Sequence, residues 1–82
     1  MRTADVKSAM IHMEQLEQLI DAEDWIETEA KAIELLIFLD HLEASYLNPT
    51  HEEIYAITQA RHTGCYAADL AAKHLILRIL NE

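Results

Sequence analysis

Apolar residues recur at steps of three and four positions along most of the chain, the spacing that places them on one face of an α-helix. The first such segment spans about residues 4–21. Thr3 stands at its N-cap position, and Asp5 lies in its first turn, where a negative charge complements the helix dipole. Its apolar stripe comprises Val6, Ala9, Met10, Met13, Leu16, Leu19 and Ile20.

A second helix is predicted over residues 25–46. The break before it contains neither Gly nor Pro; the evidence for it is that Glu27 follows Asp24 by three positions, an acidic variant of the capping box. One long helix through this point is the alternative. Leu35 and Phe38 widen the apolar arc, so we expect a central helix that is covered on more than one side. The residues expected to face inward are Trp25, Ile26, Ala30, Ile33, Leu36, Ile37 and Leu39.

The boundary before the third helix is the clearest in the sequence. Asn48 and Pro49 end the second helix, because the residue before proline avoids helical dihedral angles. Thr50 and Glu53 form a regular capping box, which predicts a helix over residues 51–80.

Gly64 raises the question of whether this last segment is one helix or two. Glycine costs about 1 kcal/mol in a helix interior, which slightly favours a kink or a division at 63–64, with Thr63 capping a fourth helix. In the alternative, Gly64 lies inside one long helix and permits close packing. The small residues that would share in that close packing are Cys65, Ala68, Ala71 and Ala72.

These elements predict an all-α fold: a small three- to four-helix bundle of antiparallel helices with short connections, forming a single domain over residues 1–82. One Gly and one Pro are too few for the turns of an all-β fold, and 51% apolar residues are too many for a disordered chain. A core of this size is marginal, and Cys65 has no second cysteine to pair with. Part of the apolar surface is therefore expected to meet a partner protein or a second copy in a homodimer.

The chain shows no pattern that indicates a signal peptide or a membrane span. The longest apolar run near the middle, Leu35–Leu39, is far shorter than the roughly 20 residues that a bilayer requires. We therefore expect a cytoplasmic protein with a reduced thiol and no membrane partner.

The net charge of −9 is unevenly distributed. Residues 1–53 contain thirteen acidic and three basic residues, whereas residues 54–82 contain two and three. Glu14, Glu17 and Asp21 step by three and four positions along the first helix, and Asp24 and Glu27 continue the charge around the turn. The simpler interpretation of this acidic ridge is a solvated face; the functional one is a docking surface for a partner with a basic surface. Direct binding of nucleic acid is disfavoured, because it requires a basic patch.

The last segment has the opposite character, since few of its positions are polar. Either the helix is enclosed in a bundle, or it offers a second apolar face to a partner or to a second copy. Trp25 is interpreted as a core anchor between the first two helices or as a partly exposed interface anchor. The residues assigned to an apolar partner or dimer surface are Trp25, Tyr66, Leu70, Leu77 and Leu80.

The sequence contains no convincing pattern for a metal site or for a catalytic site. The residue three positions before each of the five histidines is not a metal ligand, so the Glu-x-x-His pattern of helical metal sites is missing. His62, Cys65 and Asp69 share a helix face, but helical neighbours seldom orient their tips for nucleophilic catalysis, and no oxyanion-hole loop is visible. We therefore expect no enzymatic activity, no catalytic or metal-binding residues and no cofactor.

The pattern favours a non-enzymatic protein-binding module: a small acidic adaptor, chaperone or inhibitor that occupies a surface of a partner protein. One alternative is an acidic nucleic-acid mimic that inhibits a nucleic-acid-binding protein, such as a phage anti-defence protein of the anti-CRISPR kind. Another follows from residues 16–25 (LEQLIDAEDW) and 34–36 (ELL), which resemble the first helical hairpin of the flagellar export chaperone FliT. This resemblance covers about a third of the chain, includes no diagnostic motif, and implies that the last helix binds the partner or masks itself.

Overall fold

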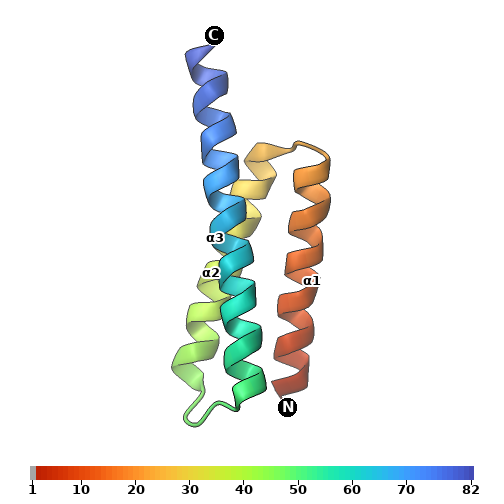
Figure 1. Cartoon of the computed structure of the whole chain (residues 1–82), viewed down its shortest axis with the longest axis vertical. Helices are drawn as coiled ribbons and strands as arrows, with labels where there is room; N and C mark the ends of the chain where they lie inside the picture. Colours follow the sequence, from red (N-terminus) through yellow and green to blue (C-terminus); the bar gives the residue numbers. More distant parts are fainter. Residues whose placement is uncertain (1) are drawn as a thin grey trace.

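The computed structural model describes residues 2–82, with side chains from Ala4 onward, and over this range it consists of three α-helices. They are α1 (Arg2–Asp21), α2 (Trp25–Ser45) and α3 (His51–Leu80). The chain reverses direction at each of the two turns, so the helices lie side by side along the long axis (Figure 1). The all-helical prediction is confirmed. Thr3 lies within α1, not before it, because the helix begins at Arg2.

The α1–α2 turn shows how a helix ends without glycine. The N–H of Glu23 donates to the carbonyl of Ile20 and the N–H of Asp24 to that of Leu19, both at 3.0 Å, which is the hydrogen-bond pattern of a Schellman motif. Glu23 adopts the left-handed conformation (φ 57°) that this motif usually gives to glycine. Asp24 then caps α2 by accepting a 3.3 Å hydrogen bond from the N–H of Glu27. The predicted break is therefore confirmed.

The α2–α3 turn follows the sequence closely. Tyr46 has an extended backbone, so α2 ends at Ser45, and the Tyr46 hydroxyl donates a 2.9 Å hydrogen bond to Asp5 Oδ2 of α1. The Thr50 hydroxyl accepts from the N–H of Glu53 at 3.2 Å, and Glu53 Oε1 accepts from the N–H of Thr50 at 2.6 Å. This reciprocal capping box starts α3 at the predicted position.

The core consists of heptad-spaced stripes, which is the pattern of left-handed helix bundles. The buried residues of α2 are Trp25, Thr28, Ala32, Leu35, Leu39 and Leu42, and those of α3 are Glu53, Ile57, Ala60, Gly64, Ala67 and Ala71. From α1, Ala9 and Leu16 are buried, with Met13 and Ile20 packed beside them. Large residues of α2 thus meet small residues of α3, which allows the two helices to pack closely.

The predicted inward face of α2 is largely wrong. Ile26, Ile33 and Ile37 are 61%, 47% and 53% exposed, and Ala30 is exposed as well. The buried stripe lies on the opposite side of the helix and includes Thr28, whose hydroxyl is satisfied by a 2.7 Å hydrogen bond to the carbonyl of Asp24. On α1, Met10 is likewise exposed.

The fourth helix that a break at 63–64 would create does not form, because α3 is continuous from His51 to Leu80. Gly64 is buried, and a Cβ atom at this position would lie 3.0 Å from Leu36 Cδ2 and 3.6 Å from Leu35 Cδ2. The close approach of α2 thus offsets the low helix propensity of glycine.

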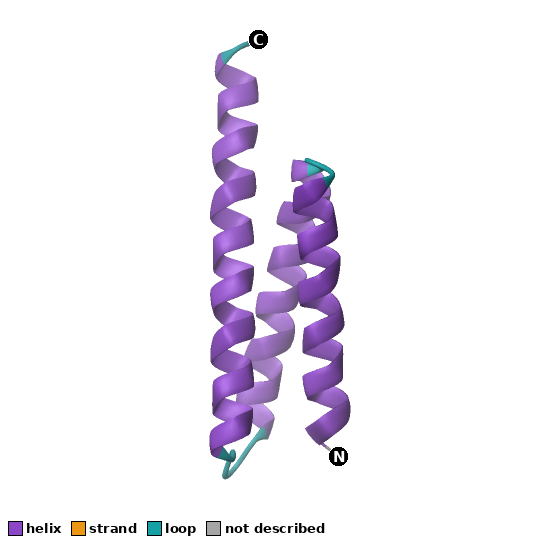
Figure 2. Ribbon diagram, turned by 45° about the vertical axis from the view of Figure 1, so that its right-hand side comes forward, coloured by secondary structure: helices purple, strands orange, loops and turns teal. Residues whose placement is uncertain are grey.

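The end of α3 extends beyond the rest of the bundle (Figures 1 and 2). His74 stacks on Trp25, the first residue of α2, with ring centroids 4.1 Å apart and planes within 6°. Residues 75–80 therefore project past the α1–α2 turn by about 9 Å at 1.5 Å per residue. The molecule measures 49 × 19 × 15 Å, and its radius of gyration of 14.0 Å exceeds the value of about 12 Å that is typical of this chain length.

Candidate interaction surfaces

The first candidate surface lies between α1 and α3. Glu17 and Ile20 of α1 line an open hollow of about 320 Å³ together with His62, Thr63 and Tyr66 of α3. Glu14 and Asp21 lie one helical turn before and after Glu17, and all three carboxylates are exposed. This part of the predicted acidic ridge therefore runs along the edge of the hollow. No ion pair involves these three residues within the described chain.

The other two ridge residues lie elsewhere. Asp24 is exposed and uses its carboxylate to cap α2. Glu27 is exposed on α2 two turns before Glu34, whose carboxylate lies 3.7 Å from His12 Nε2 on a different side of α1 from the hollow. The structure therefore brings Glu14, Glu17 and Asp21 together on one surface and places Glu27 on another.

Four of the five predicted apolar interface residues share one face of α3. Tyr66, Leu77 and Leu80 are exposed, and Leu70 is half-buried. Tyr66 lines the hollow, while Leu77 and Leu80 lie on the projecting end. We call the surface formed by Glu14, Glu17, Asp21, Tyr66, Leu70, Leu77 and Leu80 the α1–α3 face. Trp25 is not part of it, because its ring is buried against His74.

A second apolar surface lies on the side where α2 and α3 meet away from α1. Arg61 of α3 marks this side, since its Nη1 lies 2.9 Å from Asp40 Oδ1 and its Nη2 lies 2.9 Å from Glu43 Oε1. Hydrogen bonding to Glu43, then to Asp40, raises the pKa of Arg61 above its usual range. The guanidinium therefore keeps its charge at every working pH.

Isoleucines extend this surface along both helices. Ile33 and Ile26 precede Asp40 by two and four helical turns, so they share its side of α2, and Ile37 lies beside them. On α3, Ile54 stands seven residues before Arg61, and Cys65 and Ile76 stand four and fifteen residues after it, steps that keep all three on the same side of the helix. All three are exposed. We call the surface formed by these six residues the α2–α3 face. Sequence reasoning missed it, because it assigned the α2 isoleucines to the core.

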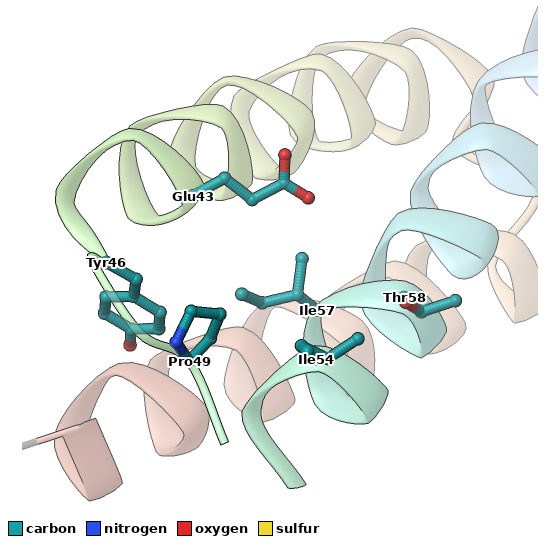
Figure 3. A pocket seen from close by; sticks show the side chains of 6 residues that line it. All are labelled: Glu43, Tyr46, Pro49, Ile54, Ile57 and Thr58. Carbon is teal, nitrogen blue, oxygen red and sulfur yellow. The ribbon is translucent and has the colours of Figure 1, made fainter. Parts of the chain in front are cut away.

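A small apolar pocket lies beside the α2–α3 turn, between the end of α2 and the start of α3 (Figure 3). Its lining residues are Glu43, Tyr46, Pro49, Ile54, Ile57 and Thr58, and its volume is about 180 Å³. Pockets for small molecules usually measure about 300–1,000 Å³. This pocket therefore fits one or two apolar side chains of another protein better than a cofactor.

The chain matches no protein-family model, no curated protein and no solved structure.

The described residues show few clusters of side chains that could bind a metal ion or take part in a reaction. Between Ala4 and Glu82, no three His, Cys, Asp or Glu side chains are grouped so that they could hold a metal ion. His62 and Cys65 line an open hollow on α3 with Thr58 and Arg61, and Asp69 is exposed one turn further on. None of the helices in the described part of the chain is long and apolar enough to cross a membrane.

Proposed function

We propose that this chain is a protein-binding module that acts through its α1–α3 face. The observation that carries this proposal is the projecting end of α3, where Leu77 and Leu80 are 48% and 75% exposed and no other helix of the described chain covers them. Exposed apolar patches of this kind usually mark interaction sites in soluble proteins. In this proposal the protein works in the cytoplasm, as an adaptor, chaperone or inhibitor rather than as an enzyme.

The shape and charge of the α1–α3 face favour one kind of partner. An apolar stripe on α3 runs beside three carboxylates on α1, and Tyr66 and Glu17 line the same hollow. An amphipathic helix presents this pattern in complementary form when basic residues border its apolar face. We therefore propose that the partner offers such a helix. An export chaperone of the FliT type would belong to the same functional class.

A second candidate function rests on the acidic ridge alone, as in an inhibitor that mimics nucleic acid. Its support is that the last turn of α1 contains no basic residue and ends in Asp21, although a negative charge is unfavourable at a helix C-terminus. Such an arrangement opposes folding, which is a reason to look for a role in binding.

Capture experiments on cells that produce the protein test the main proposal. Wild-type protein should retain a partner that the variant Leu77→Ser/Leu80→Ser loses. Ile11→Ser is the matched control, because Ile11 is equally apolar and exposed but lies on α1 outside both faces. If the partner binds the variant Leu77→Ser/Leu80→Ser as tightly as it binds the wild-type protein, the proposal is wrong.

Salt separates the two candidates once a partner is purified. Binding through the apolar stripe should weaken only modestly between low and high salt, whereas binding through the carboxylates alone should weaken steeply. The variant Glu14→Gln/Glu17→Gln/Asp21→Asn should reduce the salt dependence in the first case and abolish binding in the second.

A further inference from the structure

We propose that the α2–α3 face pairs with the same face of a second copy, in a two-fold symmetric dimer whose axis passes at the level of Leu35 and Cys65. The residues of this interface differ from those of the α1–α3 face, although Ile76 and Leu80 lie one turn apart on the projecting end of α3. The dimer therefore does not depend on the function proposed above.

The apolar residues of α2 are arranged as a two-fold interface requires. In such an interface, residue i of one copy contacts residue j of the other, and j contacts i in return. Ile33 and Ile37 lie at equal distances along the chain on either side of Leu35, and so do Ile26 and Ala44. Two copies of α2 that cross at Leu35 in opposite directions would therefore place apolar residues opposite apolar residues.

The exposed apolar residues of α3 are symmetric about the same axis. Gly64 packs against Leu35 and Leu36, so Cys65 of α3 and Leu35 of α2 lie at the same level of the bundle. Ile54 and Ile76 are equidistant from Cys65. The projecting end of α3 in one copy would then lie over the start of α3 in the other, where Ile54 and Pro49 line the small pocket. Ile76 is exposed in the single chain and would be buried there against the second copy.

One pair of opposite charges is also related by this axis. Arg61 and Asp69 lie at equal distances on either side of Cys65, so each Arg61 would face Asp69 of the second copy. Asp69 is exposed and takes part in no ion pair within the described residues. The acidic ridge of α1 lies on another side of the molecule, so the two ridges stay apart when the α2–α3 faces meet, which limits repulsion between copies.

The available area matches what a stable dimer needs. The single chain exposes 5694 Å², whereas a compact monomer of 9.4 kDa exposes about 5,000 Å². Strips about 10 Å wide along helices of 21 and 30 residues, at 1.5 Å per residue, provide about 750 Å² per copy. Specific interfaces typically bury about 800 Å² per partner.

The first test is the mass of the purified full-length protein by analytical ultracentrifugation over a range of concentrations. Wild-type protein should sediment with twice the mass of the chain and dissociate on dilution. Ile33→Glu/Ile76→Glu should sediment as a monomer with unchanged helical circular dichroism, and Asp69→Lys should weaken association about tenfold through repulsion with Arg61. Leu77→Glu is the matched control, because it lies on the α1–α3 face and should leave the dimer intact.

The second test uses Cys65 as a probe of the symmetry axis. Mild oxidation should link wild-type protein rapidly into covalent dimers, because the two thiols face each other across the axis. In Cys65→Ser/Gln59→Cys the exposed thiol lies about a third of a turn around α3 from position 65, outside the α2–α3 face, and linking should be slow. A monomer at all concentrations, a dimer that survives Ile33→Glu/Ile76→Glu, or equal linking rates for the two thiols would each overturn the proposal.

Discussion

The two sides of α2 have nearly the same apolar character, but one is buried and the other is exposed. One stripe, with Leu35 and Leu39, is completely buried, and the other, with Ile26, Ile33 and Ile37, is about half exposed. Both repeat at steps of three and four residues. Hydrophobic periodicity therefore shows that α2 is a helix, but the neighbouring helices decide which stripe is the core. The small residues of α3 accept Leu35, and no helix of the described chain covers Ile33.

The largest expected effect separates these two stripes directly. Leu35→Ala removes a fully buried side chain and should lower the free energy of unfolding by about 3 kcal/mol, because it leaves a cavity. Ile33→Ala, at a concentration where the protein is monomeric, should change it by no more than about 0.5 kcal/mol. Urea denaturation followed by circular dichroism measures both. Equal losses would show that the exposed stripe is part of the core.

Gly64→Val tests the close contact that fixes the buried stripe. The added carbons would collide with Leu36, so we expect a loss of about 2 kcal/mol in the free energy of unfolding. Gly64→Ala is the milder comparison. Its Cβ would lie close to the flexible end of Leu36, but alanine also improves the helix propensity by about 1 kcal/mol relative to glycine. If valine were tolerated as well as alanine, α2 and α3 would not approach as closely as described.

The capping box of Thr50 and Glu53 fixes the residue at which α3 begins. Thr50→Ala removes the hydroxyl that accepts the N–H of Glu53 and should destabilise the protein by about 1 kcal/mol. Thr58→Ala, an exposed change in the helix interior, is the control and should have a much smaller effect. Thermal unfolding of the three proteins distinguishes them, and equal melting temperatures would argue against the cap.

The smallest expected effect concerns the turn that orients α2 relative to α1. Glu23 has a φ of 57°, a conformation that costs an L-residue about 1 kcal/mol and that glycine adopts readily. Glu23→Gly should therefore stabilise the protein by about 0.5 kcal/mol after the added flexibility of the unfolded chain is counted. A clear loss of stability in chemical denaturation would contradict the Schellman geometry of this turn.

The sequence was sufficient for most helix ends but not for the start of α1, the continuity of α3, the orientation of α2 or the α2–α3 face. Thr50, Glu53 and Asp24 act locally, so their capping roles were readable from spacing. The inward face was not, because isoleucine and leucine are equally apolar and because the core accepts Thr28 once its hydroxyl bonds to the backbone. Gly64 was ambiguous for a similar reason: only the position of Leu36 shows that close packing outweighs propensity.

The most direct test of this account follows isoleucine methyl groups by NMR, with a soluble paramagnetic probe, over a range of protein concentrations. Ile57 should be shielded throughout because it is buried, and Ile11 should be accessible throughout because it lies outside both faces. Ile33 and Ile76 should change from accessible to shielded as the concentration rises. If they stay as accessible as Ile11 at the highest concentration, the α2–α3 face is not where two copies meet.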